Sequence, residues 1–462
     1  MYELLQCTDL GNAERFVERF GADWRYCAAE GRWYRWNGKR WRFDDREAVV
    51  AEAKAIPDEI MSEAAGLGDG GKDLARWAQT SASAERLLAM LKLARSASAI
   101  AVTPRQFDRD PMLLAVRNGT IDLRTGERRP HDPTDYITKL APVIHDPDAK
   151  CPTWDAALQL WLPDPAVRSF FQRACGYGAT ADVSEQALFF LYGDTGANGK
   201  STSLRTIQET LGDYAAQAAP NLLLQSPGER HPTEIADLMG VRFVASVEVE
   251  DGKRLAEVLV KQLTGGDRLK ARRMRQDFFE FDPTFKLFLA ANHKPIIRGT
   301  DKAIWRRIHL IPFTVHIPPD QRDRALMAKL RRERSGILRW LIDGCLAWQE
   351  HGLDVPDCIK EATNAYKEEQ DIIGLFIEEY CERDPSYEVR ANLLYQHYTG
   401  WANSAGLRPL SVVRFGEELA RHGLEPARIG HGGHRGWRGL RIRSAAEDGV
   451  LTDLYRVATG KN

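Results

Sequence analysis

The segment GDTGANGKST, residues 193–202, has the composition of a loop that binds phosphate. It follows a short apolar run and precedes a predicted helix, an arrangement in which backbone N–H groups converge on an anion. A lysine ammonium can reach phosphate oxygens there, and the hydroxyl of the next residue can hold Mg²⁺. A glycine-rich turn without a ligand is the alternative, and the strand–loop–helix context argues against it. The residues expected to bind a nucleotide are Gly193, Gly196, Ala197, Asn198, Gly199, Lys200, Ser201 and Thr202.

The spacing of this loop departs from the standard G-x-x-x-x-G-K-[ST] pattern. Asp194 occupies the place of the first glycine, with Gly193 one residue before it and Gly196 two residues after it. Three glycines would still let the backbone bend around a phosphate, so the physical requirement is met. The role of Gly193 stays open at this point.

Two carboxylates follow the next apolar run, in RFVASVEVE at residues 242–250. Strand alternation would place Glu248 and Glu250 on one face. One could orient the magnesium shell and the other could polarise an attacking water. Two solvated carboxylates at a strand end are the alternative. We predict both glutamates as catalytic residues, with Ser201 and Glu248 as the ligands of Mg²⁺.

Polar residues also mark the ends of two further apolar runs. KLFLAA ends at Asn292, whose amide could hydrogen-bond a γ-phosphate or a water, although asparagine there could also simply form a turn. In DKAIWRRIHLIPF, Arg306 and Arg307 precede the last run. A guanidinium in this place could stabilise charge on a transferring phosphate, or the pair could be a surface feature at a helix end.

These four apolar runs are short and are separated by helical or loop segments. Runs of this kind, buried on both faces and joined by long connections, indicate a parallel sheet in an α/β layer. Further upstream, WYRWNGKRWRF at residues 33–43 predicts a hairpin around Asn37-Gly38. Its tryptophans could stack on bases, but cross-strand pairing for the stability of the hairpin is the favoured interpretation.

The overall composition excludes several classes of protein. The chain has 462 residues, 43% hydrophobic and 28% charged, which indicates a globular protein of more than one domain. A net charge of -1 favours no class of partner, so a nucleic-acid surface would depend on local clustering of charge. Seven scattered cysteines without a C-x-x-C pair argue against a zinc site or a disulfide framework. No apolar run approaches the ~20 residues of a membrane span, so we expect a cytoplasmic protein.

In their order, these motifs resemble the superfamily three helicases, a branch of the AAA+ ATPases found in viruses, phages and plasmids. Within that branch the chain is similar to the phage and plasmid primase–helicase family, which is related to the poxvirus primase–helicase. VRNGTIDLRTG resembles part of the helical domain that precedes the motor, and the basic C-terminal segment resembles a winged-helix tail. The segments of the motor that carry the resemblance are LYGDTGANGKST, VASVEVEDGKRL, VKQLTGGDRLKARRMRQDFFEF, LFLAANHKP and GTDKAIWRRIHLIPF.

The resemblance implies an α/β fold: an AAA+ P-loop NTPase core with a central parallel sheet, a mostly helical domain before it and a winged-helix domain after it. The domains expected are a mostly helical one with short β hairpins at 1–175, the motor at 176–325, a helical linker or lid at 326–382, the winged helix at 383–446 and a tail at 447–462. Asn292 would be the sensor. An arginine finger would act on the nucleotide of the neighbouring subunit, with Arg307 preferred because it directly precedes a strand and Arg306 as the runner-up.

Two basic segments are candidates for binding DNA. Residues 265–277, GGDRLKARRMRQD, contain five basic side chains, and in the family this region forms a hairpin that lines the channel of a ring. Residues 404–444 contain eight arginines and three glutamates around Trp437, which suits a winged helix, or else a solvated lid that packs on the motor. The residues predicted to bind DNA are Lys270, Arg272, Arg273, Arg275, Arg414, Arg421, Arg435 and Arg438.

The function expected is that of an ATP-dependent replicative DNA helicase. It would use ATP and Mg²⁺ and form a homo-oligomeric ring, usually of six subunits. The ring would translocate on single-stranded DNA and unwind the duplex of fork DNA. The setting would be phage, plasmid or mobile-element replication in a bacterial or phage-infected cell. Fewer than 50 residues precede the helical part, so primase activity is not expected, and a separate primase or polymerase would be a partner. The alternative is an ATP-switched initiator that binds an origin without processive unwinding. A small-molecule kinase is a more distant rival.

Overall fold

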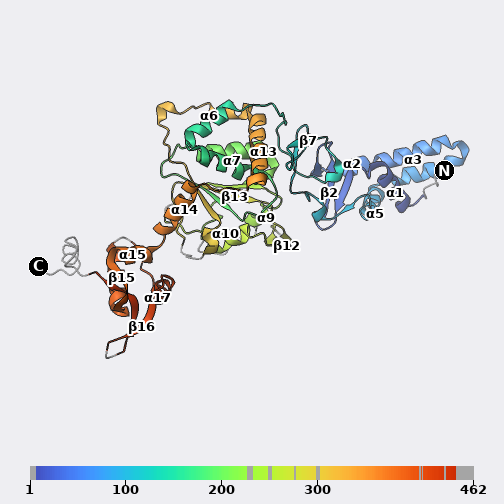
Figure 1. Cartoon of the computed structure of the whole chain (residues 1–462). Coiled ribbons are helices and arrows are strands. Elements are labelled where there is room, and N and C mark those ends of the chain that lie inside the picture. Colours follow the sequence, from blue (N-terminus) through green and yellow to red (C-terminus); the bar gives the residue numbers. More distant parts are fainter. Residues whose placement is uncertain are drawn as a thin grey trace. The chain divides into compact units, whose positions relative to one another are not determined.

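The computed structural model describes residues 7–225, 233–247, 252–274, 277–297, 302–404, 407, 409–430 and 433–443. Glu248, Glu250, Arg275 and the predicted tail at 447–462 lie outside these residues. The chain divides into two compact units (Figure 1). The first unit comprises residues 1–295 and 302–360, and the second comprises residues 296–301 and 361–462.

A five-stranded sheet forms the centre of the first unit. Its order is β14-β8-β13-β10-β9, and every neighbouring pair is parallel. The parallel sheet expected from the apolar runs is therefore confirmed. Its strands are β8 (Leu188–Tyr192), β9 (Ala215–Gln217), β10 (Phe243–Val247), β13 (Lys286–Ala291) and β14 (Ile308–Pro312).

Helices and a small hairpin surround this sheet. The helices are α6 (Pro152–Trp161), α7 (Pro165–Ala179), α8 (Lys200–Leu211), α9 (Thr233–Ala236), α10 (Glu257–Thr264), α11 (Lys302–Trp305), α12 (Leu326–Arg332) and α13 (Arg334–His351), with the 3₁₀ turns η4 (Gly212–Tyr214) and η5 (Pro319–Gln321). Strands β11 (Leu269–Arg272) and β12 (Phe278–Phe281) form the hairpin. The segment that follows the sheet was expected as a separate linker or lid, but α13 contributes to the same hydrophobic core as the sheet.

One face of the sheet presents a row of rings to α7. Phe189 stacks on Phe288 with 4.8 Å between ring centroids, and Phe288 stacks on Phe243 at 4.1 Å. His309 on β14 stacks on Phe189 from the other side at 5.8 Å. A Cβ at Gly178 of α7 would press on the rings of Phe243 and Phe288, so glycine lets the helix lie close to the row. Stacked rings across neighbouring strands hold the strand register.

Helices α7 and α13 also approach each other closely. A Cβ at Gly176 would overlap the backbone of Gly344 and Cys345, and a Cβ at Gly344 would overlap the carbonyl of Gln172. Both positions therefore require glycine for the helices to pack at this distance.

The N-terminal part combines helices with a sheet of order β3-β2-β1-β4. The hairpin predicted around Asn37-Gly38 is present as β2 and β3. Trp33 and Trp41 are buried, which confirms the structural interpretation of these two aromatics. The elements are α1 (Asp9–Phe20), β1 (Trp24–Cys27), β2 (Arg32–Trp36), β3 (Trp41–Phe43), α2 (Ala48–Ala53), α3 (Ala55–Gly66), η1 (Gly68–Gly71), α4 (Lys72–Ser81), α5 (Ala84–Ala94), β4 (Ala101–Val102), η2 (Pro104–Gln106) and η3 (Pro133–Asp135).

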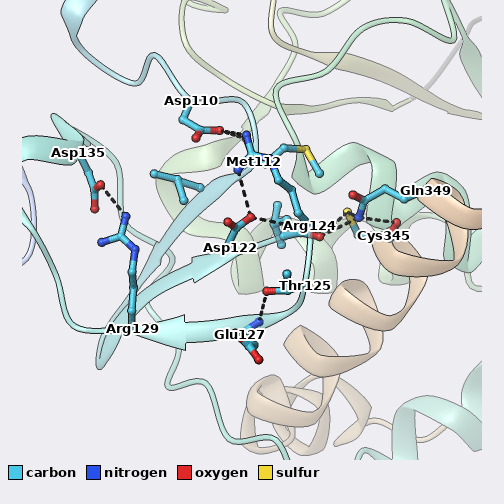
Figure 2. Close-up of polar contacts among 12 residues, drawn as sticks. Asp110, Met112, Asp122, Arg124, Thr125, Glu127, Arg129, Asp135, Cys345 and Gln349 are labelled. Atoms are coloured by element: carbon cyan, nitrogen blue, oxygen red, sulfur yellow. Dashed lines mark hydrogen bonds and ion pairs between the residues drawn. The ribbon is translucent and has the colours of Figure 1, made fainter.

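A three-stranded antiparallel meander connects this part to the central core. Its strands are β5 (Leu113–Val116), β6 (Gly119–Asp122) and β7 (Glu127–Arg129). The Arg124 guanidinium donates to Asp110 at 2.8 Å and to Asp122 at 3.2 Å (Figure 2). Gln349 of α13 donates to the Leu123 carbonyl at 2.8 Å, so the meander is attached directly to α13.

The second unit contains three helices and a three-stranded antiparallel sheet of order β15-β17-β16. Its core is built around Phe376, Tyr398, Phe415 and Leu440. The division between the units falls within α14 (Asp357–Glu369). The elements that follow α14 are α15 (Ile372–Tyr380), β15 (Cys381–Arg390), α16 (Ala391–Ser404), α17 (Val412–Arg421), β16 (Glu425–Ile429) and β17 (His434–Ile442).

Candidate nucleotide-binding site

The glycine-rich loop leaves the carboxyl end of β8 and enters α8 at Lys200. Two of its residues have positive φ angles, Ala197 at 57° and Gly199 at 91°. Gly199 is the N-cap of α8, and no side chain caps the helix there. The first N–H groups of α8 therefore remain available to an anion. Ser201 is exposed on the first turn and Thr202 is half-buried.

The Lys200 ammonium is the centre of the site. Its side chain is only 5% exposed. It donates to the carbonyl of Gly193 at 2.9 Å, to the Asn198 Oδ1 at 3.1 Å and to the Asn292 Oδ1 at 2.8 Å. A longer contact of 3.5 Å reaches the carbonyl of Thr195. All four acceptors are neutral oxygens.

Burial lowers the pKa of Lys200 to about 8, and the charge of nearby Asp194 acts in the opposite direction. The cause is desolvation, since neutral oxygens replace water less completely than an anion would. An anion placed beside this ammonium would stabilise its charged form and raise its pKa again. The site therefore favours a negatively charged ligand.

Asn198 holds the loop in shape from inside. It is 3% exposed, and its Nδ2 donates to the carbonyl of Thr195 at 2.7 Å and to that of Phe313 at 3.2 Å. Its Oδ1 accepts from Lys200. The side chain thus connects the loop, Lys200 and the segment after β14. Asn198 was predicted as part of the loop, but the sequence offers no signal for its contact with Phe313.

The three glycines of the loop have different roles. A Cβ at Gly193 would overlap the Phe313 carbonyl and the Asn198 side chain. A Cβ at Gly199 would overlap the ring of Trp161, and its positive φ also disfavours other residues. At Gly196 a Cβ would meet nothing within 4 Å. Gly193 is thus required by close packing, whereas a Cβ at Gly196 would point into open space.

The topology of the sheet places this site where ligands usually bind in α/β folds. After β8 the chain crosses to the far edge at β9, whereas after β13 it crosses to the opposite edge at β14. Adjacent strands whose connections run in opposite directions create a crevice at their carboxyl ends. Lys200 follows β8 and Asn292 follows β13, so both predicted residues meet in that crevice.

The two candidate arginines lie at the amino ends of the strands, at the opposite end of the sheet from Lys200. Arg307 directly precedes β14, and its carbonyl accepts from the N–H of Leu188, the first residue of β8. It is 7% exposed and donates to Thr264 Oγ1 at 3.1 Å and to the Ala303 carbonyl at 2.6 Å. Arg306 is exposed. The burial of Arg307 argues against our preference for it as a residue that reaches another subunit, because its guanidinium is held inside its own chain.

The predicted DNA-binding residues fall into two groups, one in each unit. Lys270, Arg272 and Arg273 belong to the β11–β12 hairpin and its turn. In the second unit, Arg414 and Arg421 lie on α17 and Arg435 and Arg438 on β17. Arg438 pairs with Glu388 at 3.0 Å and Arg421 with Glu418 at 2.6 Å, whereas Arg414 and Arg435 make no ion pair with any described residue.

In the part of the chain that the structure describes, no group of three or more His, Cys, Asp or Glu side chains could hold a metal ion. No described helix combines the length and the apolar character needed to cross a membrane. The donor set nevertheless suits Mg²⁺ bound with a phosphate, because the Ser201 hydroxyl is exposed beside the loop.

Comparison with known proteins links the two halves of the first unit to two families. Residues 13–162 match the family described as D5 N terminal like. Residues 191–307 match a family of unknown function, DUF5906. The second match begins at the end of β8 and ends at Arg307, so it contains the loop, Asn292 and both arginines.

Among curated proteins, relatives occur in large DNA viruses. The "Putative helicase L207/L206" of Acanthamoeba polyphaga mimivirus is 27% identical over 65% of this chain and 34% of its own length. The "Putative helicase 022R" of Frog virus 3 is 27% identical over 53% of this chain and 27% of its own length. The "Putative primase C962R" of African swine fever virus (isolate Tick/Malawi/Lil 20-1/1983) is 24% identical over 69% of this chain and 36% of its own length. The chain thus spans about a third of the length of these relatives.

Among solved structures, the apo structure of NrS-1 C terminal region has a similar fold. The TM-score is 0.54 at 10% sequence identity, and the similarity covers 95% of this chain and 99% of the other.

We predict that substitutions of the loop glycines separate into two classes. Gly199→Ala and Gly193→Ala should weaken ATP binding strongly and lower the melting temperature, because each adds a Cβ that overlaps a neighbour. At Gly199 the positive φ adds a strain of roughly 1–3 kcal/mol. Gly196→Ala is the matched control and should retain binding and stability. Equal losses for all three variants in calorimetry and thermal melting would contradict this interpretation.

We also predict that ATP binding is coupled to proton uptake. Lys200 has a pKa of about 8 in the free protein, and a bound anion would raise it, so binding near pH 8 to 9 should take up a proton. Affinity should fall as the pH rises above 8, because the ammonium loses its charge. Calorimetry in two buffers of different ionisation enthalpy measures the uptake. The Lys200→Ala variant should take up no proton when ATP binds to it. If it takes up as many protons per bound ATP as the wild-type protein, Lys200 is not the source.

Proposed function

We propose that the chain is of the primase–helicase type and acts as an ATP-dependent DNA helicase, an interpretation that its similarity to the putative helicases and primases of large DNA viruses supports. In this proposal it translocates on single-stranded DNA as a ring and unwinds fork DNA during replication. One observation carries the proposal: the buried Lys200 ammonium meets Asn292 at the carboxyl ends of two adjacent parallel strands. Lysine, amide and helix N-terminus together provide the contacts that the phosphates of ATP require.

Each residue of the loop has a distinct proposed role. Lys200 would bind the β- and γ-phosphates, and the N–H groups at the start of α8 would bind the β-phosphate. Asn292 lies 2.8 Å from the ammonium, so it would sense the γ-phosphate through the same contact. Asn198 would keep the loop open by its bonds to Thr195 and Phe313.

Mg²⁺ would neutralise charge on the phosphates when bound. Ser201 supplies an exposed hydroxyl for it. Glu248 and Glu250 directly follow β10, which is the neighbour of β13 in the sheet, and both lie outside the described residues. We propose Glu248 for the metal shell and Glu250 as the base that activates water. This combination of a phosphate loop, a helix N-terminus and a carboxylate-bearing neighbouring strand fits the AAA+ class of P-loop NTPases.

We propose Arg306 as the arginine finger in place of Arg307. Both arginines lie at the amino ends of the strands, whereas Lys200 lies at the carboxyl ends, so neither guanidinium can reach the nucleotide of its own subunit. An arginine at that edge can complete the site of a neighbour in a ring. The Arg306 side chain is exposed and, within the described part of the chain, its guanidinium donates to Gln186 Oε1 at 2.7 Å, whereas Arg307 is buried.

The second unit is proposed to bind DNA as a winged helix. Its order of elements, a helix, a strand, two helices and two strands, suits this architecture, with α17 as the helix that enters a groove and the β16–β17 hairpin as the wing. Arg414 on α17 and Arg435 on β17 would contact phosphates. This unit is also compatible with the initiator alternative, which differs from a helicase by the absence of strand separation.

The first prediction from this proposal concerns hydrolysis. ATP hydrolysis should be stimulated by single-stranded DNA, and Lys200→Ala should reduce it on the order of 100-fold or more, because the charge on the phosphates loses its main partner. Steady-state phosphate release with and without a single strand measures both effects. A matched control is Lys294→Ala, which removes a nearby lysine that lies over the ring of Tyr192.

The outcomes separate the candidate functions. Hydrolysis that is indifferent to single-stranded DNA, together with binding of a specific duplex, would favour the initiator. Phosphate transfer to a metabolite would favour a kinase. A wild-type protein that hydrolyses no ATP in the presence of Mg²⁺ would remove the basis of the proposal.

The second prediction concerns the finger. Arg306→Ala should bind ATP normally but lose hydrolysis by about 1000-fold. Mixing it with Lys200→Ala should restore part of the activity, because some interfaces then contain an intact lysine from one subunit and an intact arginine from the other. No recovery in subunit-mixing assays would contradict a finger acting between subunits. Arg307→Ala should instead lower the melting temperature, because it removes buried hydrogen bonds.

A further inference from the structure

The β11–β12 hairpin has one buried face and one exposed face. Leu269, Ala271 and Phe281 are 0%, 0% and 7% exposed, so they fasten the hairpin to the first unit. Lys270, Arg272 and Phe278 occupy the alternate positions and point the other way. Arg272 and Phe278 are partners in the antiparallel register.

Phe278 is unusual on this exposed face because it is a large apolar side chain that remains 52% exposed. The Lys270 ammonium lies 5.1 Å from the centroid of its ring, and the carbon of the Arg272 guanidinium lies 5.0 Å from it. Both cations belong to β11, so they approach the ring from the side of that strand. Among the described residues β12 pairs with no other strand, which leaves the other side of the ring uncovered by the sheet.

Packing among the described residues does not account for Phe278. The neighbouring Phe279 is half-buried and lies 6.0 Å from Phe281 between ring centroids, whereas Phe278 contributes to no described core cluster. An exposed aromatic ring with two cations beside it is chemically suited to a polymer that combines stackable rings with a charged backbone. A protein partner would instead have to desolvate both cations, and this costs free energy unless carboxylates meet them.

We propose that Phe278 is a base-stacking platform for single-stranded DNA, with Lys270 and Arg272 of the neighbouring strand β11 binding the phosphates next to the stacked base. The proposal deepens the helicase function and rests on it. It assigns the hairpin two separable kinds of contact, one with bases and one with the backbone. The sequence analysis had assigned only the backbone contact.

The test compares two ligands on the full-length protein. One is a fluorescent oligothymidylate, and the other is an abasic oligomer of the same length, which keeps the phosphates but has no bases. Phe278→Ala should weaken binding of oligothymidylate roughly tenfold, as the loss of one base–aromatic stack does, and leave the abasic oligomer unaffected. Phe278→Trp should retain the preference for oligothymidylate. Fluorescence anisotropy gives the four affinities of each comparison, those of the wild-type protein and the variant for the two oligomers.

Two control variants separate stacking from charge and from stability. Lys270→Ala should weaken the binding of both oligomers by a similar factor and reduce the salt dependence of this binding. Phe43→Ala removes another exposed aromatic, 39% exposed with Arg32 at 4.6 Å, and should leave both affinities unchanged. Unchanged melting temperatures would show that each variant is folded.

Three results would overturn the inference. If Phe278→Ala weakens both oligomers equally, or neither of them, Phe278 does not stack on bases, while the helicase function stands. If Phe278→Ala changes only the number of subunits measured in sedimentation, the Phe278 side chain is part of a contact between copies of the chain. If the wild-type protein binds no single strand at all, both the inference and the proposed function fail.

Discussion

Among the described residues, no carboxylate pairs with the buried Lys200 ammonium, and this charge constrains the centre of the protein. The Lys200 ammonium is surrounded by neutral oxygens, and its lowered pKa reflects the loss of water. These oxygens come from the loop and from the end of β13, so the lysine can be held only where β8 and β13 lie side by side. The parallel register, the glycines that bring the loop against Phe313, and the position of Asn292 together hold this one charge in place.

Much of the fold could be predicted from the sequence. The four apolar runs predicted four of the five strands of the parallel sheet, because strands buried on both faces have few alternatives. The short edge strand β9 (Ala215–Gln217) was not predicted. The Asn37-Gly38 hairpin followed from turn chemistry. The order of the strands and the close approach of α7 to α13 could not be predicted, because they depend on contacts such as those of Gly176 and Gly344, which are distant in the chain.

The candidate site shows the same division. Asn292 was predicted at a strand end beside the phosphate loop, and the structure brings its Oδ1 to 2.8 Å from the Lys200 ammonium, while its role at a γ-phosphate stays a prediction. The irregular position of Gly193 has its cause in Phe313, more than a hundred residues later, whose carbonyl leaves no room for a Cβ there. The preference between Arg306 and Arg307 depended on burial, and periodicity alone cannot decide burial at the junction of a short helix and a strand.

The contact between Gly199 and Trp161 has a consequence for the history of the chain. Trp161 lies in the region similar to the D5 N terminal like family, and Gly199 lies in the DUF5906 region. The border between the two families in the sequence is therefore not a border in the fold, since the nucleotide loop of one rests on an indole of the other. Recombination could join the first region of one ancestor to the second region of another. The surfaces around Trp161 and Gly199 would then come from different chains and would not be adapted to each other. In this chain, a change at Trp161 is therefore expected to be felt at Gly199, across the border between the two regions.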